Sequence, residues 1–92
     1  MLTIITCFSA KAQTSDIQIK VISESENEPL FGATVYFEEL EKGAVTDFDG
    51  IVTFTKIPNG KHIAIISYLG FETLKTTIQA PINSTLIFKL KN

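Results

Sequence analysis

The stretch IVTFTKIPNGKHIAIIS, residues 51–67, decides the fold class. Before its central Pro-Asn-Gly triplet, apolar and polar side chains alternate, with Val52 and Phe54 on one face and Thr53 on the other. Proline presets the φ of a turn, and Asn-Gly tolerates the positive φ that follows, so the triplet predicts a turn between two strands. The run at residues 61–70 is the most apolar of the expected strands and predicts a central strand that is buried on both faces.

The same period of two continues through most of the chain, with turn residues every 8–12 positions. Because no segment has a helical period, the pattern predicts an all-β, antiparallel β-sandwich of about seven strands, with an open barrel as the alternative. The predicted core includes Ile19, Val35, Phe54, Ile65 and Phe88. The expected strands are residues 16–23, 33–39, 44–47, 51–57, 61–70, 71–79 and 84–91.

Length and charge limit the function. A chain of 92 residues, 45% hydrophobic, predicts one domain. A net charge of -2 gives no basic surface for nucleic acid. All eight basic residues are lysines, so the bidentate guanidinium clamp that often holds carboxylates or phosphates is missing from the sequence.

The first residues are typical of the end of a secretory signal. Leu2–Phe8 is largely apolar, and Ala10–Ala12 is a small-x-small cleavage sequence. Residues 1–12 are therefore predicted to be a truncated signal peptide and residues 13–92 the mature, exported domain. The alternatives are a frayed tail or a first edge strand. A lipid anchor on Cys7 is disfavoured, because the preceding Ile-Ile-Thr lacks a small residue just before the cysteine.

The sequence Asp47-x-Asp49-Gly50 allows three interpretations. A calcium loop needs further acidic ligands, but the next acid after Asp49 is Glu72. A catalytic carboxylate pair needs a histidine or a basic group nearby. The third interpretation is a turn, in which aspartate bonds the backbone and glycine accepts a positive φ. We therefore expect a hairpin connection here.

His62 is the only histidine of the sequence. A zinc site needs more ligands than one histidine, so we expect His62 at the solvent edge of a strand. A spatial triad with Ser67 or Ser84 would have to use this single histidine. The sequence thus predicts no catalytic residue, no metal site and no cofactor.

Two polar segments have simple interpretations. Glu24, Glu26 and Glu28 predict a solvated loop and only weakly a cation site. Asn83–Thr85 is a formal glycosylation sequon, which matters only in a eukaryotic protein.

Three aromatic side chains are expected at the surface: Tyr36, Tyr68 and Phe71. The last two follow the most apolar strand. Aromatic residues at a strand end either cap the sandwich or form a patch that binds a partner.

An ordered set of residues resembles the carboxypeptidase-regulatory-like domain, a transthyretin-like (prealbumin-like) Greek-key sandwich. The resemblance covers residues 17–90. The set consists of Pro29, Leu30, Gly32, Ala33 and Val35, then Thr46, Asp47, Gly50 and Phe54, then Pro58 and Gly60, and finally Ser67, Tyr68, Gly70 and Phe71.

The resemblance implies a non-catalytic accessory or interaction module. Such domains occur at the N-terminus of TonB-dependent outer-membrane receptors of Bacteroidetes, in the periplasm or at the cell surface. The implied partner is a protein, namely the receptor or its remaining domains. The first alternative is a stand-alone secreted adhesin or carbohydrate-binding domain. The remote alternative is a transthyretin-like hydrolase, which is expected to need several histidines and an arginine.

The signal-peptide prediction can be tested on the secreted product. Mass spectrometry of protein recovered after export should find Gln13 as the first residue, because a signal peptidase would cut after Ala12. An exported chain that keeps residues 1–12, or one lipidated at Cys7, would contradict the prediction.

Overall fold

The computed structural model describes residues 13–92, which form seven β-strands and no α-helix. The predicted signal segment, residues 1–12, lies outside the described residues. In the part of the chain that is described, no helix could cross a membrane. The strands are β1 (Thr14–Ser23), β2 (Thr34–Phe37), β3 (Lys42–Val45), β4 (Ile51–Pro58), β5 (Gly60–Ser67), β6 (Leu74–Ala80) and β7 (Leu86–Leu90).

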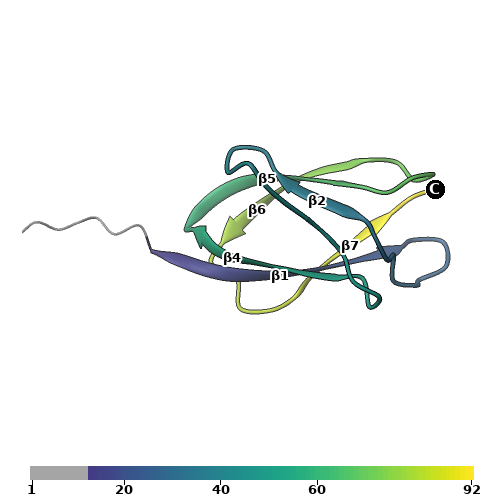
Figure 1. Cartoon of the computed structure of the whole chain (residues 1–92), viewed down its shortest axis with the longest axis horizontal. Coiled ribbons are helices and arrows are strands. Elements are labelled where there is room, and N and C mark those ends of the chain that lie inside the picture. Colours follow the sequence, from purple (N-terminus) through teal and green to yellow (C-terminus); the bar gives the residue numbers. More distant parts are fainter. Residues whose placement is uncertain (1–12) are drawn as a thin grey trace, which may run out of the picture.

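The strands form two sheets, and Figure 1 shows them as two layers of a sandwich. One sheet has the order β4-β1-β7, and the other has the order β3-β2-β5-β6. The predicted all-β sandwich is thus confirmed. One pairing differs from the purely antiparallel prediction, because β1 and β7 pair in parallel. Consecutive strands run back and forth between the two ends, so two odd-numbered strands that become neighbours point the same way.

The alternation read from the sequence places the core correctly in most strands. Ile17, Ile19 and Val21 of β1 are buried, and polar neighbours face outward. Phe37 of β2 meets Phe54 of β4 edge to face, with ring centroids 4.9 Å apart, which joins the two sheets. The core contains Ile17, Ile19, Val21, Leu30, Ala33, Val35, Phe37, Val52, Phe54, Ile57, Ala64, Ile66, Ile78, Ala80 and Leu90, and Phe88 packs against it.

The prediction that the strand after the Pro-Asn-Gly triplet is buried on both faces is wrong. In β5, Ala64 and Ile66 point into the core, whereas Ile63 and Ile65 are only half-buried on the outer face. Ile65 is therefore not a core residue. The strand is central in its sheet, between β2 and β6, but the described residues contain no third layer to cover its outer face.

His62 is also placed differently from the prediction. It lies two residues before Ala64, on the inward face of β5, and is only 8% exposed. Its ring packs edge to face against Phe37, with centroids 6.3 Å apart. Nε2 lies 2.6 Å from the backbone oxygen of Pro58, so this nitrogen carries the proton and donates it. Nδ1 lies 3.7 Å from a carboxylate oxygen of Glu39.

The Pro-Asn-Gly triplet forms the predicted turn, but the strands that it joins lie in different sheets. β4 ends at Pro58 and β5 begins at Gly60, so the chain passes from one layer to the other through Asn59. Gly60 has a φ of 125°, a conformation that side chains rarely allow. The amide of Asn59 donates to the backbone oxygen of Gln13, which fixes the corner to the start of β1.

The far end of β1 is closed by a backbone contact at Val21. The Val21 amide donates to the oxygen of Gly50 at 2.8 Å, and the Val21 oxygen accepts from the amide of Leu30 at 3.0 Å. Gly50 has a φ of 75°, and a Cβ atom there would lie 2.6 Å from the Val21 oxygen. Only glycine fits at this position, because the two backbones touch.

Replacing Gly50 by alanine should destabilise the fold by about 3 kcal/mol or more, because the positive φ and a backbone overlap act together. Gly32 provides the matched control: its φ is 88°, but a Cβ atom there would meet nothing within 4 Å. Gly32→Ala should therefore cost only about 1 kcal/mol, from the positive φ alone. Urea unfolding of both variants measures the difference, and equal losses would contradict the contact at Val21.

Candidate interaction surface

Three connecting segments and the last residues of the chain gather at one end of the sandwich, which we call the loop end. It comprises residues 24–33, 46–50, 68–73 and 91–92. Figure 1 shows these loops around the C-terminus, away from the start of β1. Backbone hydrogen bonds hold them together, since Glu24 donates to Leu90 and Glu72 donates to Lys91.

The Asp47-x-Asp49-Gly50 segment is a turn, as predicted. One carboxylate oxygen of Asp47 accepts from the backbone amides of Asp49 and Ile51, each at 2.9 Å, and the Gly50 amide donates to the Asp47 backbone oxygen. The expected hairpin is wrong, because this turn connects β3 in one sheet to β4 in the other. Among residues 13–92, no three His, Cys, Asp or Glu side chains are grouped as a metal site would require.

Thr46 fixes the loop before β2 against this turn. Its side chain is buried, and its hydroxyl accepts from the Ala33 amide at 2.9 Å and donates to the Leu30 oxygen at 2.5 Å. The Thr46 backbone also pairs with Ala33 and Gly32. Four hydrogen bonds therefore hold the segment that carries Phe31 next to the turn that carries Phe48.

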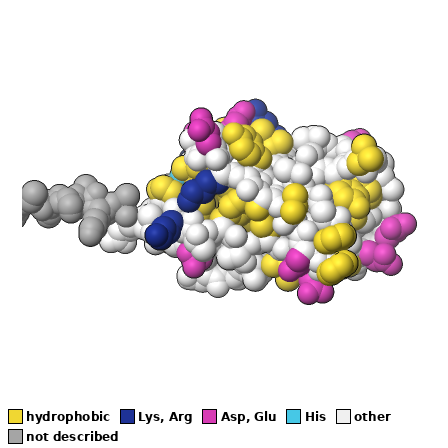
Figure 2. Space-filling model, in the orientation of Figure 1, with side chains coloured by type: hydrophobic (Ala, Val, Ile, Leu, Met, Phe, Trp, Pro, Cys, Tyr) yellow, Lys and Arg dark blue, Asp and Glu magenta, His cyan; other side chains and the backbone are white. Residues whose placement is uncertain are grey.

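Phe31 and Phe48 form a stacked pair on the outside of the molecule. Their ring centroids are 4.3 Å apart and their planes differ by 13°. Phe31 is 53% exposed and Phe48 is 78% exposed, so the stacking covers one side of the pair and water contacts the rest. Figure 2 shows hydrophobic side chains among acidic ones at the right-hand end of the view, where the loops gather.

Sequence reasoning missed this pair. The available signal was Phe48 itself, which stands between two aspartates inside a turn and therefore cannot point into the core. Its partner Phe31 lies 17 positions earlier, so only the folded chain reveals the stacking. Leu69 is a further exposed apolar residue at the loop end.

The three aromatic residues expected at the surface have different environments. Tyr68 and Phe71 are half-buried, pack against the core and lie with ring centroids 5.5 Å apart, which fits the capping alternative. Tyr36 is 38% exposed on the outer face of its sheet, where its ring lies against Gly43 of β3.

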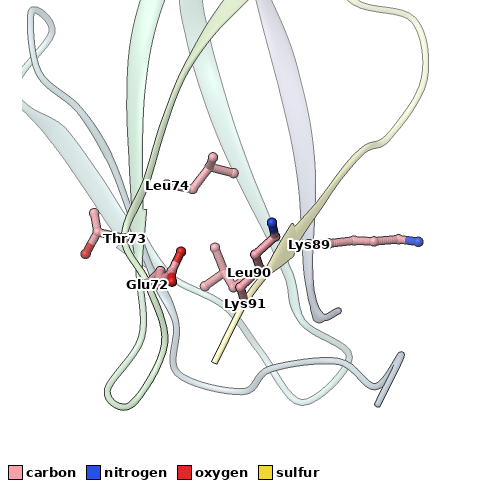
Figure 3. Close-up of a pocket in the computed structure, with 6 residues that line it drawn as sticks. All are labelled: Glu72, Thr73, Leu74, Lys89, Leu90 and Lys91. Carbon is pink, nitrogen blue, oxygen red and sulfur yellow. The ribbon is translucent and has the colours of Figure 1, made fainter. Parts of the chain in front are cut away.

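The hollows in the described surface are small. One of about 210 Å³ lies between the start of β6 and the end of β7, and Figure 3 shows the Lys89 side chain pointing away from Glu72. Another of about 320 Å³ is lined by polar residues next to Asn92. Sites for small organic ligands usually measure about 300–1,000 Å³ and are mainly apolar. The stacked aromatic pair is therefore a better candidate for binding than either hollow.

The geometry of His62 does not assemble a nucleophile and a base. Its Nε2 is bonded to the Pro58 backbone, and in the described residues its Nδ1 has no hydrogen-bond partner. Ser67 lies near the opposite end of β5, and Ser84 lies in the connection before β7. The structure thus brings neither serine into a hydrogen bond with the histidine.

Comparison with known proteins identifies the family. The sequence profile of the CarboxypepD_reg-like domain matches residues 17–92. The chain belongs to the CarboxypepD_reg-like domain family. A TonB-dependent receptor of Formosa agariphila is 36% identical to the domain over 52 residues, which is 56% of this chain and 5% of the receptor. The chain thus spans about one twentieth of the length of that relative.

Two solved structures with a similar fold are pilus proteins. The CarboxypepD_reg-like domain resembles the major pilin subunit of Bacillus cereus, with a TM-score of 0.68, 17% identity and coverage of 87% of this chain and 30% of the pilin. The pilus 2b backbone protein of group B streptococcus gives a TM-score of 0.68, 18% identity and coverage of 86% and 41%. At these identities the likeness shows the fold alone.

Most of the residues that carry the family resemblance lie at the loop end, whereas Pro58 and Gly60 form the corner at the opposite end. Leu30 and Gly50 contact Val21, and Thr46 and Asp47 bond the neighbouring backbone. This part of the ordered pattern therefore closes one end of the sandwich.

Thr46 offers a direct test of this closure. Thr46→Val keeps the shape of the side chain but leaves the Ala33 amide and the Leu30 oxygen without their hydroxyl partner, so we expect a loss of about 1–3 kcal/mol. Thr46→Ser retains the hydroxyl and should lose about 1 kcal/mol or less. Chemical unfolding of both variants is the measurement. A valine variant as stable as the wild type would refute the role given to the hydroxyl.

Proposed function

We propose that this CarboxypepD_reg-like domain is a non-catalytic, exported interaction module of a TonB-dependent outer-membrane receptor system. It works in the periplasm or at the cell surface, through contact with the receptor or with the receptor's other domains. The observation that carries the proposal is the 36% identity over 52 residues to a TonB-dependent receptor, combined with the family match over residues 17–92.

The side chains of the domain support binding in preference to chemistry. His62 is buried and bonded to the backbone, whereas a general base must reach the proton that it removes. By contrast, Phe31 and Phe48 present apolar surface to water on a framework fixed by hydrogen bonds. An exposed aromatic group on a rigid support is typical of protein–protein contacts.

The second candidate is a stand-alone adhesin or carbohydrate-binding domain. The exposed ring of Phe48 favours it, because sugars also stack on aromatic faces. The partial burial of Tyr68 and Phe71 disfavours it, since these rings cap the core and do not form a platform.

An antibody against the domain would test the proposal in fractionated cells of the source organism. We expect the antigen in the cell envelope, either within a receptor-sized polypeptide or as a smaller chain that crosslinks to a TonB-dependent receptor. Recovery in the cytosolic fraction would contradict export. An envelope chain that crosslinks to no receptor but binds a glycan array, and loses that binding in Phe48→Ser, would support the second candidate.

A further inference from the structure

The loop end combines its exposed aromatic pair with an uneven charge. Its segments contain six of the ten acidic residues of the chain but only one lysine, Lys91. Figure 2 shows acidic side chains next to hydrophobic ones at this end of the view. The six acids are Glu24, Glu26, Glu28, Asp47, Asp49 and Glu72.

These carboxylates are not neutralised by neighbouring lysines. Within residues 13–92, the one side-chain contact of 4 Å or less between a basic residue and a carboxylate joins His62 to Glu39, which lie at the opposite end of the sandwich. At the turn, one carboxylate oxygen of Asp47 accepts hydrogen bonds from two backbone amides. The side chain of Asp49 is exposed to solvent. The loop end therefore has a negative potential that its own residues do not cancel.

Phe48 places an exposed aromatic ring within this negatively charged surface. Phe48 lies between Asp47 and Asp49, and most of its ring is open to solvent. An ammonium or guanidinium group placed over such a ring gains a cation–π attraction, and a surrounding excess of negative charge adds to it. The arrangement is complementary to a cation that also carries apolar surface, and lysine and arginine side chains have this character.

We propose that the loop end binds a positively charged polypeptide segment, with a lysine or arginine side chain of the partner resting on the exposed Phe31–Phe48 pair. The neighbouring carboxylates supply the charge complement. The inference rests on the proposed interaction function and names the chemistry of the partner. A neutral polysaccharide fits less well, because it would not use the unpaired carboxylates.

The experiment uses the full chain and two synthetic peptides of equal length, one of alternating arginine and glycine and one of alternating glutamate and glycine. Calorimetry at low salt should show saturable binding of the arginine peptide, with no binding of the glutamate peptide. Raising the ionic strength to about 0.15 M should weaken the binding, because the charges are exposed to solvent. Phe48→Ser and Asp49→Asn should each weaken it about threefold, and the double variant about tenfold.

Two matched controls separate the loop end from general effects. Ile87→Ser removes another exposed apolar side chain, on β7, and Glu38→Gln removes a negative charge from the β2–β3 turn at the opposite end. Both should change the affinity less than about twofold. Circular dichroism should show the same fold in every variant, since the changed side chains are all exposed.

Several outcomes would overturn the proposal. They are no binding of the arginine peptide, equal binding of the glutamate peptide, or unchanged affinity in the Phe48→Ser/Asp49→Asn double variant. Binding of soluble starch in place of the peptide, lost in Phe48→Ser, would also overturn it and assign the surface to carbohydrate. If the domain crosslinks to a receptor in cells but ignores the arginine peptide, only the partner chemistry is wrong and the proposed function stands.

Discussion

The backbone of Val21 makes two hydrogen bonds, one with the turn before β4 and one with the loop before β2. The loop end is built around this double contact. β1 pairs with β4 as far as Lys20 and Ile51. Beyond that point the Val21 amide donates to the Gly50 oxygen, and the Val21 oxygen accepts from the Leu30 amide. Two connecting segments thus continue the hydrogen bonding of β1 where its pairing with β4 ends. The contact is possible only because Gly50 has no side chain.

This closure positions an aromatic pair that stays exposed to water. A phenylalanine side chain left exposed forgoes roughly 1.5–3 kcal/mol that its burial would contribute. Stacking recovers part of this for Phe31 and Phe48, and the bonds of Thr46 and Asp47 hold the two backbones that carry the rings. The proposed interaction uses the aromatic surface that remains exposed.

The alternation of side chains predicted the strands and most of the core, because burial on one face imposes a period of two. It failed at β5, where Ile63 and Ile65 look like core residues but face outward, and where His62 looks polar but faces inward. Periodicity alone cannot say which face of an apolar strand is covered, since that depends on the layer opposite. The pairing of Phe31 with Phe48 depends on the closure at Val21, so local patterns contain no sign of it.

The double contact at Val21 should hold Leu30 and Gly50 as firmly as the strands hold their own residues. Amide hydrogen exchange followed by NMR tests this most directly. The amides of Val21 and Leu30 should exchange as slowly as those in the middle of β1 and β2, and far more slowly than the amide of Leu69 in the β5–β6 loop. If the amides of Val21 and Leu30 exchange as fast as the amide of Leu69, the contact at Val21 opens readily and does not close the sandwich.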